Sequence, residues 1–206
     1  MLRQIFRFVR GTIAVAGLAI VAATPAAAQT ITYSFTGFGT GTLNGVAFTQ
    51  RSFAFTMSTP TAAVSETRFG AGVPSVSGLT ASFIIAGTSG GTISGLYAFN
   101  NKTVRTVGFG SETNSDLLNL NGLAGLATYG MITNYGPQTA TGSALFFGQF
   151  VNQETSAGAL TFSNVSTATF QATVDGNVVP EPSTYLLLST GLLVMAVVVR
   201  RRRIRN

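Results

Sequence analysis

The chain has 206 residues and a formal net charge of +6, yet only 9% of its residues are charged and it contains no Cys, His or Trp. The missing residue types exclude disulfides, thiolate nucleophiles, Cys- or His-ligated metals and the Ser-His-Asp triad. Between residues 29 and 179 only four Lys and Arg stand against five Asp and Glu, so the middle lacks the clustered cations that a nucleic-acid-binding surface needs.

The first 28 residues have the three parts of a secretory signal peptide. A basic start is followed by the uncharged apolar stretch of residues 11 to 23 and then by small residues. Ala26 and Ala28 fit the small-residue pocket of signal peptidase, so we expect cleavage after Ala28 and a mature chain that begins at Gln29. The alternative is an uncleaved N-terminal membrane helix, but the apolar stretch is shorter than the roughly 20 residues that a span requires.

Residues 29 to 177 are predicted to form one all-β extracytoplasmic domain. Apolar side chains alternate with polar ones at Ile31, Tyr33 and Phe35, which is the pattern of a half-buried strand. The dipeptide Asn44-Gly45 tolerates the two positive φ angles of a type I′ hairpin, so a turn is expected there. Further strands are predicted over residues 52–57, 80–86, 92–99, 103–109, 144–151, 158–165 and 167–174.

Eight or more short strands with turns at this spacing predict an antiparallel β-sandwich, of which the jelly roll is one arrangement. Residues 111 to 129 break the pattern, because they hold several glycines and the run Asp-Leu-Leu-Asn-Leu. A short helix or a long loop is expected in that segment.

No cofactor is expected. Gly37, Gly39 and Gly41 mimic part of a dinucleotide-binding fingerprint, but Thr42 stands where the third glycine belongs. A strand also follows where the fingerprint requires a helix. A pliant strand and turn is therefore the preferred interpretation of these glycines.

One group of oxygen donors suits a cation. Glu112 and Asp116 lie near the amides of Asn114, Asn119 and Asn121, and such oxygens can hold Ca²⁺. The EF-hand spacing is missing, so a solvated loop is the preferred interpretation. Glycoside hydrolysis needs two paired carboxylates, and no acidic residue of the domain has a buried sequence context; we therefore expect no catalytic residue.

The cations of the domain offer one further hypothesis. They could line a sugar-binding face beside Tyr97, although ordinary surface charge explains them more simply. These cations are Arg51, Arg68, Lys102 and Arg105.

Residues 185 to 199 are apolar and uncharged and lead directly into a cluster of four arginines. As a helix, these residues span about 22 Å, somewhat less than the roughly 30 Å hydrocarbon core, and long arginine side chains can cover part of the difference. We expect a single C-terminal transmembrane helix with the cluster in the cytoplasm and the domain on the far side. The alternative is a core helix, but one that is apolar on every face is hard to bury in a β domain. The cytoplasmic anchor consists of Arg200, Arg201, Arg202 and Arg203.

The tripeptide Pro180, Glu181 and Pro182 precedes this span. Its prolines hold the segment extended, which suits a protease or transpeptidase cleft and equally a stiff spacer between domain and membrane. Together with the span, the arginine cluster and the N-terminal signal, the tripeptide resembles the PEP-CTERM sorting signal of Gram-negative bacteria. The resemblance implies that residues 178 to 206 are a sorting region and that an integral membrane enzyme, exosortase, processes the chain near the tripeptide.

Two functional hypotheses remain open. The first is a non-catalytic surface or matrix protein, anchored in the membrane, processed by exosortase and then carried to the cell surface or medium. Its link to exopolysaccharide and biofilm is implied by the resemblance alone. The second is an exported carbohydrate-binding or carbohydrate-active protein with the same tail, which an aromatic-lined groove would favour; paired carboxylates about 5 to 9.5 Å apart would point to an enzyme.

Overall fold

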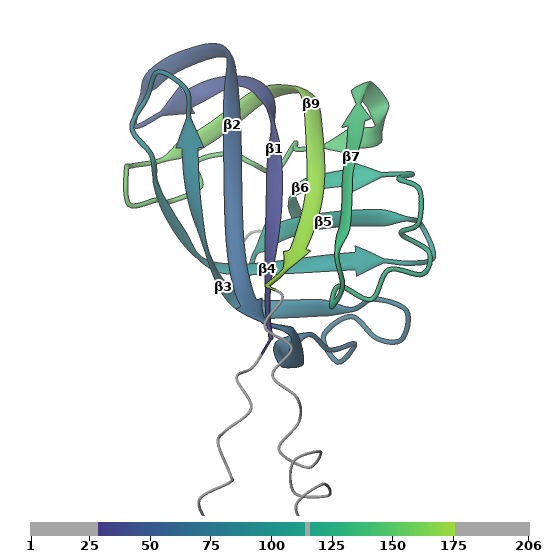
Figure 1. The fold of residues 1–206 in the computed structure, drawn as a ribbon. Helices are drawn as coiled ribbons and strands as arrows, with labels where there is room; N and C mark the ends of the chain where they lie inside the picture. Colours follow the sequence, from purple (N-terminus) through teal and green to yellow (C-terminus); the bar gives the residue numbers. More distant parts are fainter. Residues whose placement is uncertain (1–28, 114–115, 176–206) are drawn as a thin grey trace, which may run out of the picture. The chain divides into compact units, whose positions relative to one another are not determined.

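The computed structural model describes residues 29–113 and 116–175, which form one antiparallel sheet of nine strands (Figure 1). The unit Ala28–Gly176 is compact by itself and contains the whole of this sheet. The strands are β1 (Thr30–Leu43), β2 (Val46–Pro60), β3 (Ser75–Ile85), β4 (Gly91–Asn101), β5 (Thr106–Ser111), β6 (Asp116–Asn121), β7 (Tyr135–Thr141), β8 (Leu145–Phe146) and β9 (Leu160–Val174). Two single 3-10 turns, η1 (Thr61–Ala63) and η2 (Gly142–Ala144), follow β2 and β7.

The predicted signal peptide and sorting region lie outside the described residues. The expected transmembrane helix therefore belongs to a part of the chain about which the structure makes no statement. Within residues 29–113 and 116–175, no helix has the length and apolarity to span a membrane.

The first hairpin agrees with its predicted alternation and turn. Ile31, Tyr33 and Phe35 are fully buried on the inner face of β1. β1 pairs with β2 along nearly its whole length, and the two strands are joined by Asn44 at φ 49° and Gly45 at φ 78°. Two successive positive φ angles match the right-handed twist of a hairpin, so the predicted Asn-Gly turn is confirmed.

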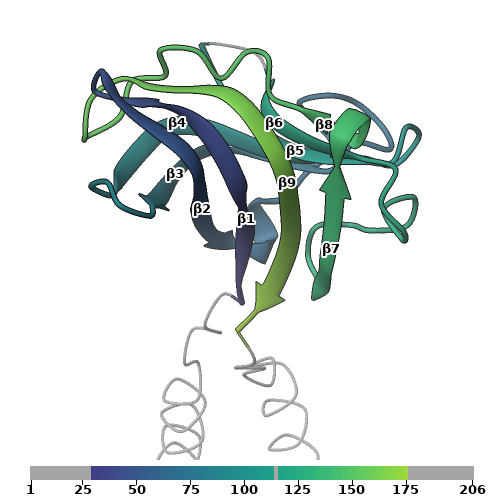
Figure 2. The same cartoon turned by 90° about the horizontal axis from the view of Figure 1, so that it is seen from above.

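The expected two-sheet sandwich is replaced by one continuous, nearly closed sheet. The strand order is β7-β9-β1-β2-β3-β4-β5-β6-β8, and the sheet coils until β6 contacts β7 and β9 and β8 contacts β9 (Figure 2). The reason lies in β1, β2 and β9, which are 14 or 15 residues long where shorter strands were predicted. Bulges in these strands increase the twist and bend the sheet, so each long strand runs continuously from one side of the curled sheet to the other.

The glycines of β1 allow this bending. The register between β1 and β2 shifts between Gly39 and Gly41, and a Cβ atom built on Gly41 would stand 1.9 Å from the carbonyl oxygen of Thr161 in β9. At Gly37 a Cβ atom would stand 2.1 Å from the carbonyl oxygen of Thr167. The glycines therefore let β9 approach β1 closely, and the strand interpretation of this motif is confirmed.

Aromatic side chains fill the inside of the curled sheet. Phe55 lies at their centre, with ring centroids 5.3 Å from Phe109, 5.7 Å from Phe150 and 5.9 Å from Phe83. Such contacts bury large apolar areas and add edge-to-face attraction. Because side chains occupy the interior, a ligand site has to be sought on the outer face of the sheet.

Three parts of the chain differ from the strand prediction. Residues 111 to 129, expected to be a helix or loop, contain β6. β7 was not predicted, because its sequence Tyr-Gly-Pro-Gln-Thr-Ala-Thr lacks apolar alternation. The strand predicted over 144–151 is reduced to β8, whose two residues pair only with Asn119 and Leu120.

Candidate functional site

Three rows of side chains cross the outer face of β4, β5 and β6. Residues paired across neighbouring antiparallel strands point to the same face of the sheet. In two of the three rows the central residue is glycine, so the floor between the flanking side chains is bare backbone. The rows are Tyr97, Gly110 and Asp116; Phe99, Gly108 and Asn119; and Asn101, Thr106 and Asn121.

The bare floor lets side chains of β4 and β6 meet across β5. The Tyr97 hydroxyl donates a hydrogen bond of 2.6 Å to Oδ1 of Asp116, passing over the row of Gly110. Asn119 leans onto Gly108, where an added Cβ atom would lie 2.1 Å from its Oδ1. The second row therefore depends on glycine for its geometry.

Asp116 and Asn119 form a small polar group on this floor. Nδ2 of Asn119 donates to Oδ2 of Asp116 over 2.8 Å, so the carboxylate accepts one bond on each oxygen. Oδ1 of Asn119 has no hydrogen-bond partner among the described residues, although the side chain is only 7% exposed. A buried acceptor without a donor is costly, and this oxygen lies against the backbone of Gly108, enclosed from solvent.

The β2–β3 loop, residues 61–74, covers one end of the face. Its Phe69 packs on Tyr97 and Phe99, with ring centroids 5.4 and 5.9 Å away. The Arg68 guanidinium lies 4.3 Å from the centre of the Tyr97 ring and 5.1 Å from that of Phe69, which is cation–π geometry. Tyr97 and Phe99 are thereby buried although they point outward, while Phe69 remains 45% exposed.

Ion pairs hold the loop in place. Nζ of Lys102 lies 2.9 Å from Oε1 of Glu66, and Oε2 of Glu66 accepts from the backbone N–H of Gly72. The Lys102 hydrogen bond, followed by that of Gly72, lowers the pKa of Glu66 below its usual value of 4.5. Nη1 of Arg68 lies 3.6 Å from Oε1 of Glu112.

Two adjoining hollows run along these rows and together define what we call the outer-face groove. One has a volume of about 310 Å³ and the other about 340 Å³, and Phe99, Asn101 and Asp116 line both. Exposed apolar side chains stand at the rim: Phe69 beside the first hollow, and Phe146 beside the second. The outer-face groove thus combines apolar edges with a hydrogen-bonding floor.

Burial raises the pKa of the Tyr97 hydroxyl, and the bond to Asp116 raises it further. The phenol therefore stays protonated at any physiological pH and acts as a hydrogen-bond donor to Asp116. Tyr97 fixes the position of the carboxylate and carries no charge into the groove.

The four cations predicted to line a sugar face divide into two groups. Arg68 and Lys102 flank the groove, and Arg68 stacks on Tyr97 as the hypothesis requires. Arg51 lies elsewhere, against Gly87 beyond the end of β3. Arg105 is in the β4–β5 turn with φ 56°. Arg105 thus follows Val104 and precedes Thr106, which both line the groove, whereas Arg51 lies apart from it.

The carboxylates considered for Ca²⁺ have separate partners. Oε1 of Glu112 accepts from the backbone N–H of Gly78, whereas Asp116 accepts from Tyr97 and Asn119. Asn121 accepts from the Thr106 hydroxyl. In the part of the chain that the structure describes, no three acidic residues gather as a metal-binding group would.

Sequence reasoning missed Phe69 and the pairing of Asp116 with Tyr97. A signal was present: Tyr97 and Phe99 alternate in β4, and Gly108 and Gly110 alternate in β5. Alternation puts each pair on one face of its strand. Only the register shows that the two pairs face each other.

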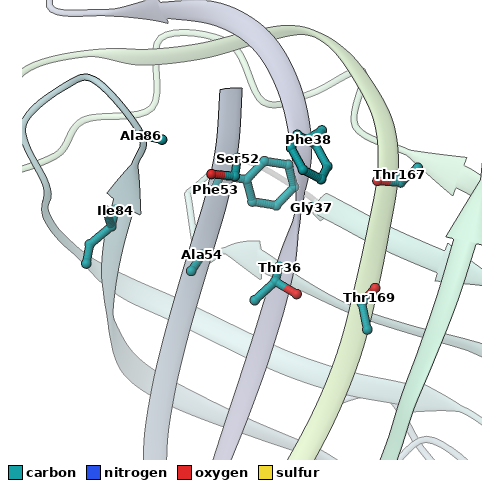
Figure 3. A pocket seen from close by; sticks show the side chains of 10 residues that line it. All are labelled: Thr36, Gly37, Phe38, Ser52, Phe53, Ala54, Ile84, Ala86, Thr167 and Thr169. Carbon is teal, nitrogen blue, oxygen red and sulfur yellow. The ribbon is translucent and has the colours of Figure 1, made fainter. Parts of the chain in front are cut away.

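A second hollow lies on the outer face of β9, β1, β2 and β3 (Figure 3). Its volume is about 420 Å³, and its lining includes Thr36, Phe38, Ile84 and Thr169 but no charged or amide side chain. Phe38 is 50% exposed. The second hollow resembles the outer-face groove in aromatic exposure, but its polar side chains are hydroxyls of Thr and Ser and include no carboxylate or amide, so it provides a matched comparison.

Residues 178–203 match the model of the PEP-CTERM protein-sorting motif. No curated protein and no solved structure matches the chain. The matched segment contains Pro180, Glu181 and Pro182, which lie outside the described residues. The chain therefore carries a C-terminal PEP-CTERM sorting motif, which implies an exported protein that exosortase sorts to the cell surface.

Proposed function

We propose that this protein is a non-catalytic surface or extracellular-matrix protein that holds extracellular polysaccharide through its β domain. It is anchored in the membrane by its tail and then processed by exosortase near Pro180, Glu181 and Pro182. The outer-face groove is the observation that carries the binding part of the proposal. The sorting motif supports the location at which such binding is useful.

The groove suits a sugar because its edges and floor differ in character. Phe69 and Phe146 present exposed rings, which can cover the apolar C–H face of a pyranose. Asp116, Asn119 and Asn101 line the floor, and carboxylate and amide groups bond with hydroxyls as acceptors and donors. Ligand sites in general combine apolar walls with a few fixed polar groups.

Binding without catalysis is favoured by how the carboxylates are arranged. Asp116 is the one carboxylate among the described residues that lines the two hollows. Glu66 and Glu112 are paired with Lys102 and Arg68 at the rim. Glycoside hydrolysis uses two carboxylates that both face the bond to be cleaved, so a single one supports recognition in preference to hydrolysis.

Affinity gel electrophoresis tests the proposal directly. The domain of residues 29–177 is run through gels that contain the exopolysaccharide of its native host, with a non-binding protein as mobility standard. We expect the domain to be retarded by the polysaccharide and Phe69→Ala to reduce the retardation. The matched control is Phe38→Ala, which removes a ring of similar exposure from the second hollow. Equal mobility with and without the polysaccharide contradicts the proposal.

A further inference from the structure

We propose that the outer-face groove selects uncharged, hydroxyl-rich sugar chains and discriminates against acidic polysaccharides. This inference rests on the proposed function, since it names the ligand class of the same groove. Three observations carry it: the state of the cations at the rim of the groove, the Asp116 carboxylate on its floor, and the length of the face.

Arg68 and Lys102, the two cations beside the β2–β3 loop at the rim of the groove, are already engaged. Arg68 stacks on Tyr97, lies 3.6 Å from Glu112 and donates from Nη1 to Ser77 over 2.9 Å. Lys102 is paired with Glu66 at 2.9 Å. An acidic sugar would have to displace one of these carboxylates to pair with Arg68 or Lys102.

On the floor of the groove, the Asp116 carboxylate forms no ion pair within the described residues. Asp116 is held by the Tyr97 hydroxyl and by Nδ2 of Asn119, and both donors are neutral. A uronate brought to hydrogen-bonding distance of this floor would stand close to a like charge, which disfavours binding even when water screens the pair. Neutral chains avoid this cost.

The Asp116 carboxylate also has unmet accepting capacity. Each Asp116 oxygen has further acceptor capacity beyond the one bond it accepts. Sugar hydroxyls donate, whereas a carboxylate group only accepts. The part of the floor around Asp116 is therefore complementary to hydroxyls and mismatched to the carboxylate of a uronate or to a sulfate ester.

The face is long enough for more than one sugar. The rows of Tyr97, Phe99 and Asn101 are two residues apart along β4, so the outer two are separated by roughly 13 Å of strand. Asn101 lies in the last row, where its Oδ1 accepts from the backbone N–H of Thr103. Within the described residues its Nδ2 donates no hydrogen bond, so it can bond with a second sugar unit. A chain, and not a monosaccharide, fills the groove.

The test compares the binding of neutral and acidic fractions of the host exopolysaccharide. The host exopolysaccharide is separated by anion exchange into a neutral and an acidic fraction, and each is titrated against the domain of residues 29–177 in low salt with EDTA. We expect the neutral fraction to bind and the acidic one to bind at least about fivefold more weakly. Asp116→Asn is expected to narrow this difference, because it removes the charge and keeps a side chain of the same shape.

Each outcome has a distinct meaning. Equal or tighter binding of the acidic fraction overturns this inference and leaves the proposed function standing. Absence of binding by both fractions overturns the proposed function and this inference together. If Phe69→Ala and Asp116→Asn leave binding unchanged, as Phe38→Ala is expected to do, the groove is not the site and the inference is wrong. Circular dichroism of each variant establishes that the sheet is intact.

Discussion

Replacing Gly108 with alanine should fill the floor of the outer-face groove and strain the sheet beneath it. The added Cβ atom would lie 2.1 Å from Oδ1 of Asn119 and 2.6 Å from the carbonyl oxygen of Leu118. The Asn119 side chain can rotate away, but the Leu118 oxygen belongs to β6 and moves only with that strand. Overpacking of this kind costs about 1–3 kcal/mol.

The assay is thermal unfolding of the domain, followed by polysaccharide binding at a temperature where the variant is folded. For a domain of this size each kcal/mol of lost stability lowers the unfolding temperature by roughly 2–4 °C. We also expect the Asn119 side chain to rotate away from the added methyl group and polysaccharide binding to weaken. Gly148→Ala is the control, because nothing lies within 4 Å of a Cβ atom built there and its φ is not left-handed; its stability should change by less than about 0.5 kcal/mol. If Gly108→Ala unfolds at the wild-type temperature and binds as well, the close contact between Gly108 and Asn119 is not as described.

Three further predictions concern other parts of the chain. Tyr33→Phe should lower the free energy of unfolding by about 1–2 kcal/mol in urea, because the buried carbonyl of Met131 loses the 2.7 Å bond from the Tyr33 hydroxyl; no loss would show that this carbonyl finds another donor. The pKa of Glu66 should be below 4.5 by NMR titration and return toward 4.5 in Lys102→Met. Because folding lowers this pKa, the ionised Glu66 carboxylate stabilises the folded domain at pH values above its unfolded-state pKa, and this contribution is lost as the pH falls through its folded-state pKa. Glu181→Ala should leave a longer, membrane-bound form by intact-mass analysis of host fractions, and a mass that ends at the same residue in both proteins would contradict sorting at the tripeptide.

Local patterns were sufficient to predict part of the fold. The alternation at Ile31, Tyr33 and Phe35 and the Asn44-Gly45 turn depend only on neighbours in sequence, and both agree with the structure. The single sheet could not be predicted in the same way, because it depends on β9 pairing with β1 from more than a hundred residues away. The spacing of short strands is common to sandwiches and curled sheets.

The candidate site likewise has a part that residue type predicts and a part that depends on strand pairing. Residue type alone suggests that Arg68, as one of four cations, could line a sugar-binding face beside Tyr97, although it favours ordinary surface charge; the structure places Arg68 in contact with Tyr97. Asp116 was considered only as a cation ligand, since its contact with Tyr97 depends on the register across Gly110. By contrast, the sorting motif is contiguous in sequence, so the chain alone was enough to predict it.

The pairing of β1 with β9 has a consequence for how the protein is handled during export. Ile31 is paired with Val174, and the backbone N–H of Asp175 bonds to the carbonyl of Thr30, so the chain enters and leaves the sheet at one pole. The expected signal peptidase site before Gln29 and the expected exosortase site near Pro180 are each only a few residues along the chain from that pole. Both expected cleavages would therefore leave only short stretches of chain attached to the same pole of the sheet.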